Sequence, residues 1–184
     1  AGAPAGGIRA DLTAGRLDPL AGPPILFAMP DTINDVRPFR ALQYDPAVVG
    51  EVGPCLSQPY DVISPAQQED YYRQHPHNVI RLILNRQEPS DDASNNRYTR
   101  ARDLLAGWRA AGVLHGTARP SFWVYEQQFD IPGIGRRTVK GFIGAVRLAE
   151  YAERRILPHE KVLSGPLEDR IRLTETANAQ FEYI

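Results

Sequence analysis

The chain has 184 residues, of which 42% are hydrophobic and 23% charged, so it is long enough and apolar enough to bury a core. Its formal net charge of −1 shows no excess of lysine and arginine, which argues against nucleic acid as a partner. The sequence has no run of about 18 apolar residues, which argues against a membrane-spanning helix. The single cysteine, Cys55, forms no internal disulfide, and we expect a cytoplasmic protein.

The first 35 residues are expected to form a flexible tail. Ala, Gly, Pro and Leu dominate up to Ala28 without a clean period, and Met29 could itself be the natural start. The apolar stretch over 25–29 is shorter than the core of a signal peptide. From Val36 onward the pattern changes, and we expect a single domain over residues 36–184.

The first elements expected in this domain are a helix and a strand. Ser64, Pro65 and Gln67 have the pattern of a capping box, which predicts a helix over 65–74. Residues 78–84 are apolar and rich in β-branched side chains, which is typical of a buried strand.

Two helices and a β-hairpin are expected to complete the domain. Tyr98, Leu105 and other apolar residues at spacings of three and four predict a helix that ends at Gly112. The remaining predicted elements are strands over 121–129 and 136–148, the turn between them over 131–135, and a helix over 166–178. This order predicts an α/β or α+β fold, with a mixed sheet, a central antiparallel hairpin and flanking helices.

The strongest chemical candidate is the segment over 157–170. It places His159 and Glu160 shortly before Asp169 and Arg170, with a Ser-Gly-Pro turn between the two pairs. A general base and an anion-binding cation on a tight loop are what a transfer reaction on a small polar substrate needs. A solvated loop followed by a helix start, where Asp169 and Arg170 pair locally, would give the same pattern. Both interpretations stay open at the level of sequence.

Five further residues are candidates for binding substrate or phosphate. A proline-rigidified turn could bring Tyr60 and Asp61 to the rim of a pocket, although Asp61 could also only stabilise the entry to the next helix. Arg40 is either an anion contact or a surface residue in a salt bridge. Asn78 and Arg81 open the expected strand, where they would face a cleft, unless Arg81 lies on the solvent side.

No metal centre and no standard nucleotide loop is predicted. His75 and His77 have the spacing of two groups on one strand face, but no further His, Cys or acidic residue is placed to complete a zinc site. The glycines do not form the G-x-x-x-x-G-K-S/T run of a phosphate loop.

Several blocks of the chain, in their order and spacing, resemble the family called domain of unknown function 1015. The blocks are residues 37–42, 59–64, 78–82, 125–127, 159–160 and 168–170. Members of that family continue beyond the position of Ile184, so the resemblance implies that residues 36–184 are the N-terminal part of a longer architecture or a shortened relative.

The resemblance also implies an activity. Members of the family are related in gene setting to serine metabolism, and the family has a distant similarity to ParB/sulfiredoxin-like free-serine kinases. Together these imply phosphoryl transfer to a small hydroxyl compound from ATP, ADP or pyrophosphate. In that scheme Glu160 orients or deprotonates the hydroxyl, His159 and Arg170 contact phosphate oxygens, and Mg²⁺ assists.

Two positions depart from the family's pattern. Val162 stands where a threonine is usual, and Leu167 stands where a lysine is usual, so one hydroxyl and one cation are missing. These changes leave two alternatives to a kinase. One is a non-catalytic ligand-binding or regulatory module, and the other is an interaction fragment that needs a missing second half, a partner chain or a homo-oligomer.

Overall fold

The computed structural model describes residues 36–154 and 164–182. Its contacts divide the chain into two compact units. Of the described residues, one unit comprises 36–40 and 119–149, and the other comprises 41–118, 150–154 and 164–182. The predicted tail over 1–35 lies outside the described residues. Helices and small antiparallel sheets together confirm the mixed α and β fold class.

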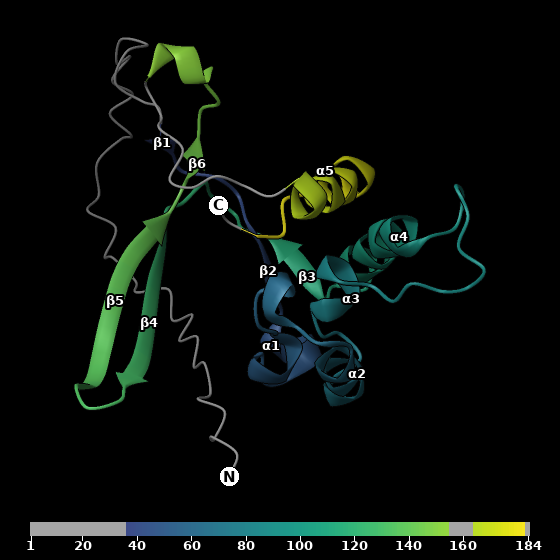
Figure 1. Cartoon of the computed structure of the whole chain (residues 1–184), viewed down its shortest axis with the longest axis horizontal. Coiled ribbons are helices and arrows are strands. Elements are labelled where there is room, and N and C mark those ends of the chain that lie inside the picture. The colour runs from purple at the N-terminus through teal and green to yellow at the C-terminus, as the bar shows by residue number, and fades with distance from the viewer. Residues whose placement is uncertain (1–35, 155–163, 183–184) are drawn as a thin grey trace. The chain divides into compact units, whose positions relative to one another are not determined.

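The first unit contains the predicted β-hairpin. Strand β4 (Trp123–Ile131) pairs antiparallel with β5 (Gly135–Ile143) along its whole length (Figure 1). Gly133 and Gly135 in the turn have φ values of 77° and 89°, which glycine adopts at little cost because it has no Cβ. The sequence therefore located this hairpin and its turn correctly.

The second hairpin strand ends earlier than the sequence predicted. It stops at Ile143 instead of Leu148, and β6 (Ala145–Val146) then pairs antiparallel with β1 (Val36–Arg37). Gly144 lies at the break, where an added Cβ would come within 2.9 Å of the ring of Phe122. The pairing therefore changes from β4–β5 to β1–β6 at a residue that lies close to Phe122. No local sequence pattern reveals this contact.

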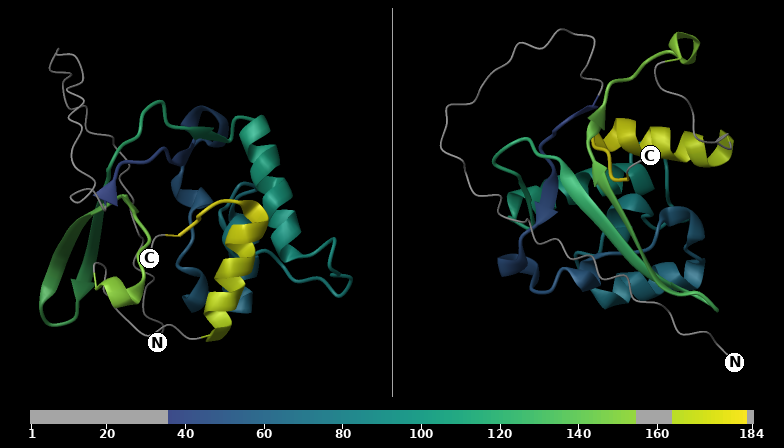
Figure 2. Two further views of the ribbon diagram at one scale, coloured as in Figure 1. Left: turned by 90° about the horizontal axis from the view of Figure 1, so that it is seen from above. Right: turned by 90° about the vertical axis from the view of Figure 1, so that its left-hand side faces the viewer.

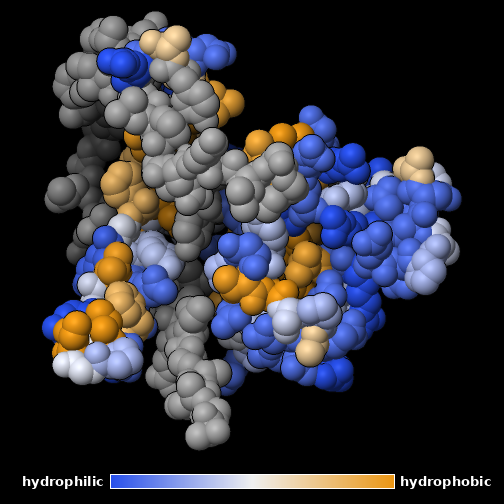
Figure 3. Space-filling view, viewed as in Figure 1, coloured by the Kyte–Doolittle hydropathy of each residue, from blue (hydrophilic) through white to orange (hydrophobic). Residues whose placement is uncertain are grey.

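The described surface of the hairpin carries several large apolar side chains. Val124 is 79% exposed and Phe142 is 66% exposed, and these two residues lie opposite each other in the β4–β5 register. Figure 3 shows hydrophobic surface on this hairpin.

The second unit contains two short strands and several short helical turns. Strand β2 (Leu42–Tyr44) pairs antiparallel with β3 (Leu114–Gly116). The short helical elements are α1 (Pro46–Val49) and the 3₁₀ turns η1 (Gly53–Cys55), η2 (Tyr60–Val62) and η3 (Tyr151–Glu153).

Helix α2 (Pro65–Gln74) confirms the first helix predicted from the sequence. The Ser64 hydroxyl accepts a hydrogen bond from the Gln67 amide at 3.3 Å, and the Gln67 side chain accepts one from the Ser64 amide at 2.9 Å. Both halves of the capping box are formed, so a local signal was sufficient here.

The strand predicted over 78–84 is wrong, because this segment contains helix α3 (Ile80–Ile83). The Asn78 side chain accepts a hydrogen bond from the Ile80 amide at 2.9 Å, which fixes the start of the helical turn. Its Nδ2 donates to two backbone carbonyls, those of Pro54 at 2.8 Å and Leu56 at 2.9 Å. Contacts with a distant segment therefore overrode the strand preference of the β-branched residues.

The last two helices end within two residues of their predicted positions. Helix α4 (Arg97–Ala110) starts after Asn96, whose side chain accepts from the amides of Tyr98 and Thr99. Gly112, with φ at 74°, lies just beyond its end. Helix α5 (Ser164–Ala177) packs beside α4, as both views in Figure 2 show.

The main core cluster lies in the second unit. Its members include Cys55, Leu82, Leu105, Trp108 and Val113. Among the described residues, every buried hydrophobic side chain belongs to this unit. Within the same residues, no helix has both the length and the apolar character that crossing a membrane requires.

Candidate functional site

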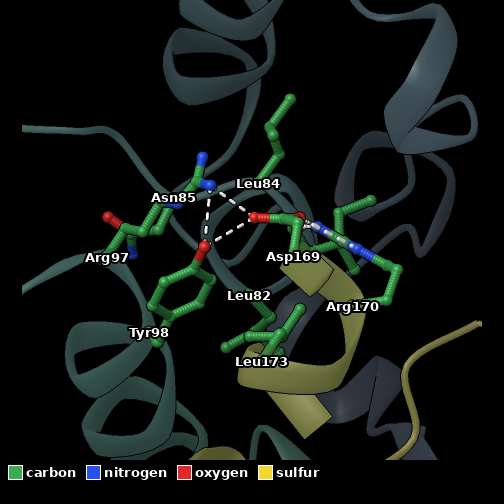
Figure 4. Close-up of a pocket in the computed structure, with 9 residues that line it drawn as sticks. Leu82, Leu84, Asn85, Arg97, Tyr98, Asp169, Arg170 and Leu173 are labelled. Atoms are coloured by element: carbon green, nitrogen blue, oxygen red, sulfur yellow. Dashed lines mark hydrogen bonds and ion pairs between the residues drawn. The ribbon is translucent and has the colours of Figure 1, made fainter. Parts of the chain in front are cut away.

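The candidate site is centred on Asp169, near the start of α5. Its Oδ1 accepts hydrogen bonds from the Tyr98 hydroxyl at 2.7 Å and from Nη2 of Arg97. Its Oδ2 accepts from Nε of Arg170 at 3.1 Å and from Nη2 of the same residue. Figure 4 shows the carboxylate between these donors, which come from α4 on one side and α5 on the other.

These donors keep Asp169 ionised. Burial acts to raise the pKa of Asp169, but the hydrogen bonds from Arg170 and Tyr98 and the charges of Arg170 and Arg97 outweigh burial. The pKa therefore lies below its ordinary value. A carboxylate held in this way is a weak base, so it is better suited to positioning cations than to accepting a proton.

Arg170 is fixed by partners from several parts of the second unit. Its Nη2 donates to the carbonyl oxygen of Ile83 at 2.9 Å, and its Nη1 lies 3.3 Å from Oε2 of Glu182. Its Cζ lies 3.8 Å from the centre of the Tyr60 ring, a cation–π distance. The guanidinium is therefore held in one orientation before any ligand binds.

Glu182 is the second carboxylate of the site, and its environment differs from that of Asp169. Burial raises the pKa of Glu182, and the charge and hydrogen bond of Arg170 only partly oppose this effect. The two carboxyl groups thus have pKa values shifted in opposite directions, which is the arrangement that lets one carry a proton while the other stays charged. Glu182 is the better proton carrier of the two.

Tyr60 is held as a neutral phenol. Burial raises the pKa of Tyr60, although the charge of Arg170 opposes this. Its ring covers one face of the Arg170 guanidinium, and its hydroxyl remains a hydrogen-bond donor at neutral pH.

The space inside the site is small. A pocket of about 10 Å³ is lined by residues that include Asn85, Tyr98, Asp169 and Leu173 (Figure 4). This volume holds about one water molecule. A substrate would therefore need to bind at the edge of the network or open it.

The structure brings together three of the residues predicted from the sequence, namely Asp169, Arg170 and Tyr60. Asp61 lies next to Tyr60 in η2 with its side chain exposed. Arg40 is exposed and belongs to the first unit. His159 and Glu160 lie outside the described residues, so their roles stay predictions.

Asn78 and Arg81 have partners elsewhere in the second unit. Asn78 is fully buried, and its contacts described above are all with backbone groups. Arg81 donates from Nη2 to the carbonyl oxygen of Tyr72 at 2.8 Å and lines a different pocket.

Three residues of the network were not among the sequence candidates. Tyr98 was assigned to the apolar face of its helix, whereas both Tyr98 and Arg97 contact Asp169. Glu182 was not assigned a role. Arg97 and Tyr98 lie more than seventy residues from Asp169 in the chain, so no local spacing signals these contacts.

The cofactors expected from the sequence, a nucleotide and Mg²⁺, stay predictions. In residues 36–154 and 164–182, no group of three or more His, Cys, Asp or Glu side chains is arranged to hold a metal ion. Arg97 and Arg170 are the cations of the described site that could contact phosphate oxygens.

A family model described as "Protein of unknown function (DUF1015)" matches residues 36–184. No curated protein and no solved structure matches the chain. These comparisons therefore give no support to the more distant similarity to ParB/sulfiredoxin-like kinases.

Proposed function

The chain belongs to the DUF1015 family, and on that premise we propose that it transfers a phosphoryl group to the hydroxyl of a small molecule such as serine. ATP, ADP or pyrophosphate is the donor, and Mg²⁺ assists. Glu160 orients or deprotonates the acceptor hydroxyl, His159 and Arg170 contact phosphate oxygens, and Asp169 positions Arg170.

The observation that carries this proposal is the fixed orientation of Arg170. Phosphoryl transfer depends mainly on positioned cations, because charge is spread over the phosphoryl oxygens in the transition state. Asp169 binds one edge of the guanidinium, and the Tyr60 ring covers one face. The entropy lost in ordering the Arg170 side chain is therefore already lost in the folded protein, before the substrate binds.

Glu182 supports the proposal because it controls access to Arg170. The hydrogen bond between Nη1 of Arg170 and Glu182 is 3.3 Å long, which is the longest of the hydrogen bonds described for this guanidinium. Its raised pKa makes Glu182 easier to protonate than an ordinary glutamate. A phosphate oxygen would compete for Nη1, and protonation of Glu182 would release the cation to it.

A thermal-shift experiment tests the assigned role of Arg170. We expect ATP, ADP or pyrophosphate with Mg²⁺ to raise the melting temperature by about 5 °C or more at a hundredfold excess over the dissociation constant. Arg170→Lys should lose most of this shift, because lysine lacks the planar fork of donors. Arg172→Lys, at an exposed position of the same helix, is the matched control and should keep it. No shift with any donor would contradict the proposal.

A second candidate is a ligand-binding module without catalysis. The observation that favours it is the small size of the pocket, about 10 Å³, around a network whose charges already pair with each other. Val162 and Leu167, in place of the usual threonine and lysine, point the same way. This candidate predicts binding of nucleotide or serine without turnover, and phosphoserine formation would exclude it.

A further inference from the structure

We propose that a second pocket of the second unit binds a small organic anion through Arg81. The pocket has a volume of about 490 Å³, within the roughly 300–1,000 Å³ typical of small-molecule sites. Its lining includes Tyr72 of α2, Arg81 of α3, Arg86, and Arg100, Leu104 and Gly107 of α4. This binding does not depend on the phosphoryl transfer proposed above.

Two of the three arginines in this pocket are already neutralised. Arg86 binds both carboxylate oxygens of Glu69, with its Nε 2.8 Å from Oε1. Arg100 binds both carboxylate oxygens of Asp91, at 2.5 Å and 3.0 Å. These two guanidinium groups therefore contribute little net charge to the pocket.

Arg81 differs because it forms no ion pair with any carboxylate in the part of the chain that the structure describes. Its Nη2 donates to the carbonyl oxygen of Tyr72, and its Cζ lies 4.2 Å from the centre of the Tyr72 ring. Its Nε is buried and has no hydrogen-bond partner among the described residues. A half-buried guanidinium that forms no ion pair and has a buried nitrogen without a hydrogen-bond partner is unfavourable, so a bound anion would stabilise this arrangement.

The lining also restricts the kind of anion. Leu104, Gly107 and Trp108 supply an apolar wall along α4, which suits a ligand with a planar or apolar body. Glu88 and Asp103 line the pocket as well, at exposed positions. Their negative charges disfavour polyanions, so the expected ligand carries one carboxylate or phosphate group on an apolar body.

Gly107 provides a way to fill the pocket without altering Arg81. A Cβ at this position would meet no heavy atom within 4 Å outside its own helix turn. Gly107→Phe is therefore expected to fold and to occupy part of the apolar wall. Arg109→Gln, at an exposed position of the same helix outside the pocket lining, serves as the control.

Isothermal titration calorimetry with phenyl phosphate and inorganic phosphate, at constant ionic strength, tests this proposal. We expect phenyl phosphate to bind about tenfold or more tightly than inorganic phosphate. Arg81→Gln should weaken both by about tenfold or more, because a charge-assisted hydrogen bond is lost. Gly107→Phe should weaken phenyl phosphate, and Arg109→Gln should change neither affinity.

Equal phenyl phosphate affinity in the wild type and in Arg81→Gln would overturn the proposal, as would the absence of binding to the wild type. If Arg81→Gln does not fold, Gly107→Phe decides, because unchanged phenyl phosphate affinity in that variant places the ligand outside this pocket. Arg170→Lys should retain phenyl phosphate binding, which separates this site from the one centred on Asp169.

Discussion

Asp169, Arg170 and Tyr60 could be selected from the sequence, but their partners Arg97, Tyr98 and Glu182 could not. Asp169 and Arg170 lie in one block of the chain next to a turn, so their chemistry is visible locally. The donors from Arg97 and Tyr98 reach Asp169 only because α4 packs against α5. The contacts described for Asp169 lie within the chain, and we expect it to act as a positioning residue for Arg170.

Replacing Asp169 by asparagine should destabilise the fold at neutral pH by about 2 kcal/mol, because the half-buried Arg97 loses its counter-charge and Arg170 keeps only the longer ion pair with Glu182. The folded-state pKa of Asp169 is lowered, so its stabilising contribution is present above about pH 4, its unfolded value, and is lost as the pH falls through the folded-state pKa. Urea unfolding of Asp169→Asn and wild type at pH 7 and at pH 3 measures both effects.

The control for this prediction is Asp103→Asn, which removes a carboxylate paired with Arg102 on the exposed face of α4. Its stability should stay close to that of the wild type at both pH values, because exposed pairs contribute little. If Asp169→Asn is as stable as the wild type at pH 7, the network does not hold the site together.

At the scale of elements, the sequence predicted those whose signals are local. The capping residues of α2, the apolar spacing of α4 and the glycines of the β4–β5 turn each identify their element within a few positions. Helix α3 was missed because its start depends on Asn78 bonding to carbonyls of the η1 region, more than twenty residues earlier. A β-branched apolar run fits either state until that contact is known.

Two glycines near the end of α4 provide a matched prediction. Neither position has a heavy atom within 4 Å of an added Cβ, but Gly107 is helical and Gly112 has φ at 74°. Gly107→Ala should stabilise the protein by about 0.5–1 kcal/mol, because glycine is a poor helix residue. Gly112→Ala should destabilise it by about 1 kcal/mol, because a side chain strains that backbone.

Thermal denaturation of the two alanine variants beside the wild type measures both changes. Shifts of the melting temperature in the same direction would contradict the assigned backbone conformations.

At the scale of the whole molecule, the net charge of −1 hides an uneven distribution. The described carboxylates of the first unit are Glu126 and Asp130, whereas its described cations are Arg37, Arg40, Arg119, Arg136, Arg137, Lys140 and Arg147. The second unit carries most of the acidic residues of the chain. Total charge averages over the two units, so composition alone did not reveal this difference.

The two units should also differ in local stability. The buried core cluster lies in the second unit, whereas β4 and β5 form a two-stranded sheet with exposed apolar side chains. Such a hairpin is marginally stable without further packing. Hydrogen exchange measured by mass spectrometry should therefore show faster exchange for peptides from 123–143 than for peptides from 97–110. Equal protection of both regions would contradict this ranking.

The central proposal is phosphoryl transfer that depends on Arg170 and Glu160. The most direct measurement is phosphorus NMR of wild type, Glu160→Gln and the control Glu168→Gln, each incubated with serine, Mg²⁺ and ATP, ADP or pyrophosphate. We predict phosphoserine from the wild type and from Glu168→Gln, at an exposed position of α5, and about a hundredfold less from Glu160→Gln. No phosphoserine with any donor, or equal rates for wild type and Glu160→Gln, would contradict the account.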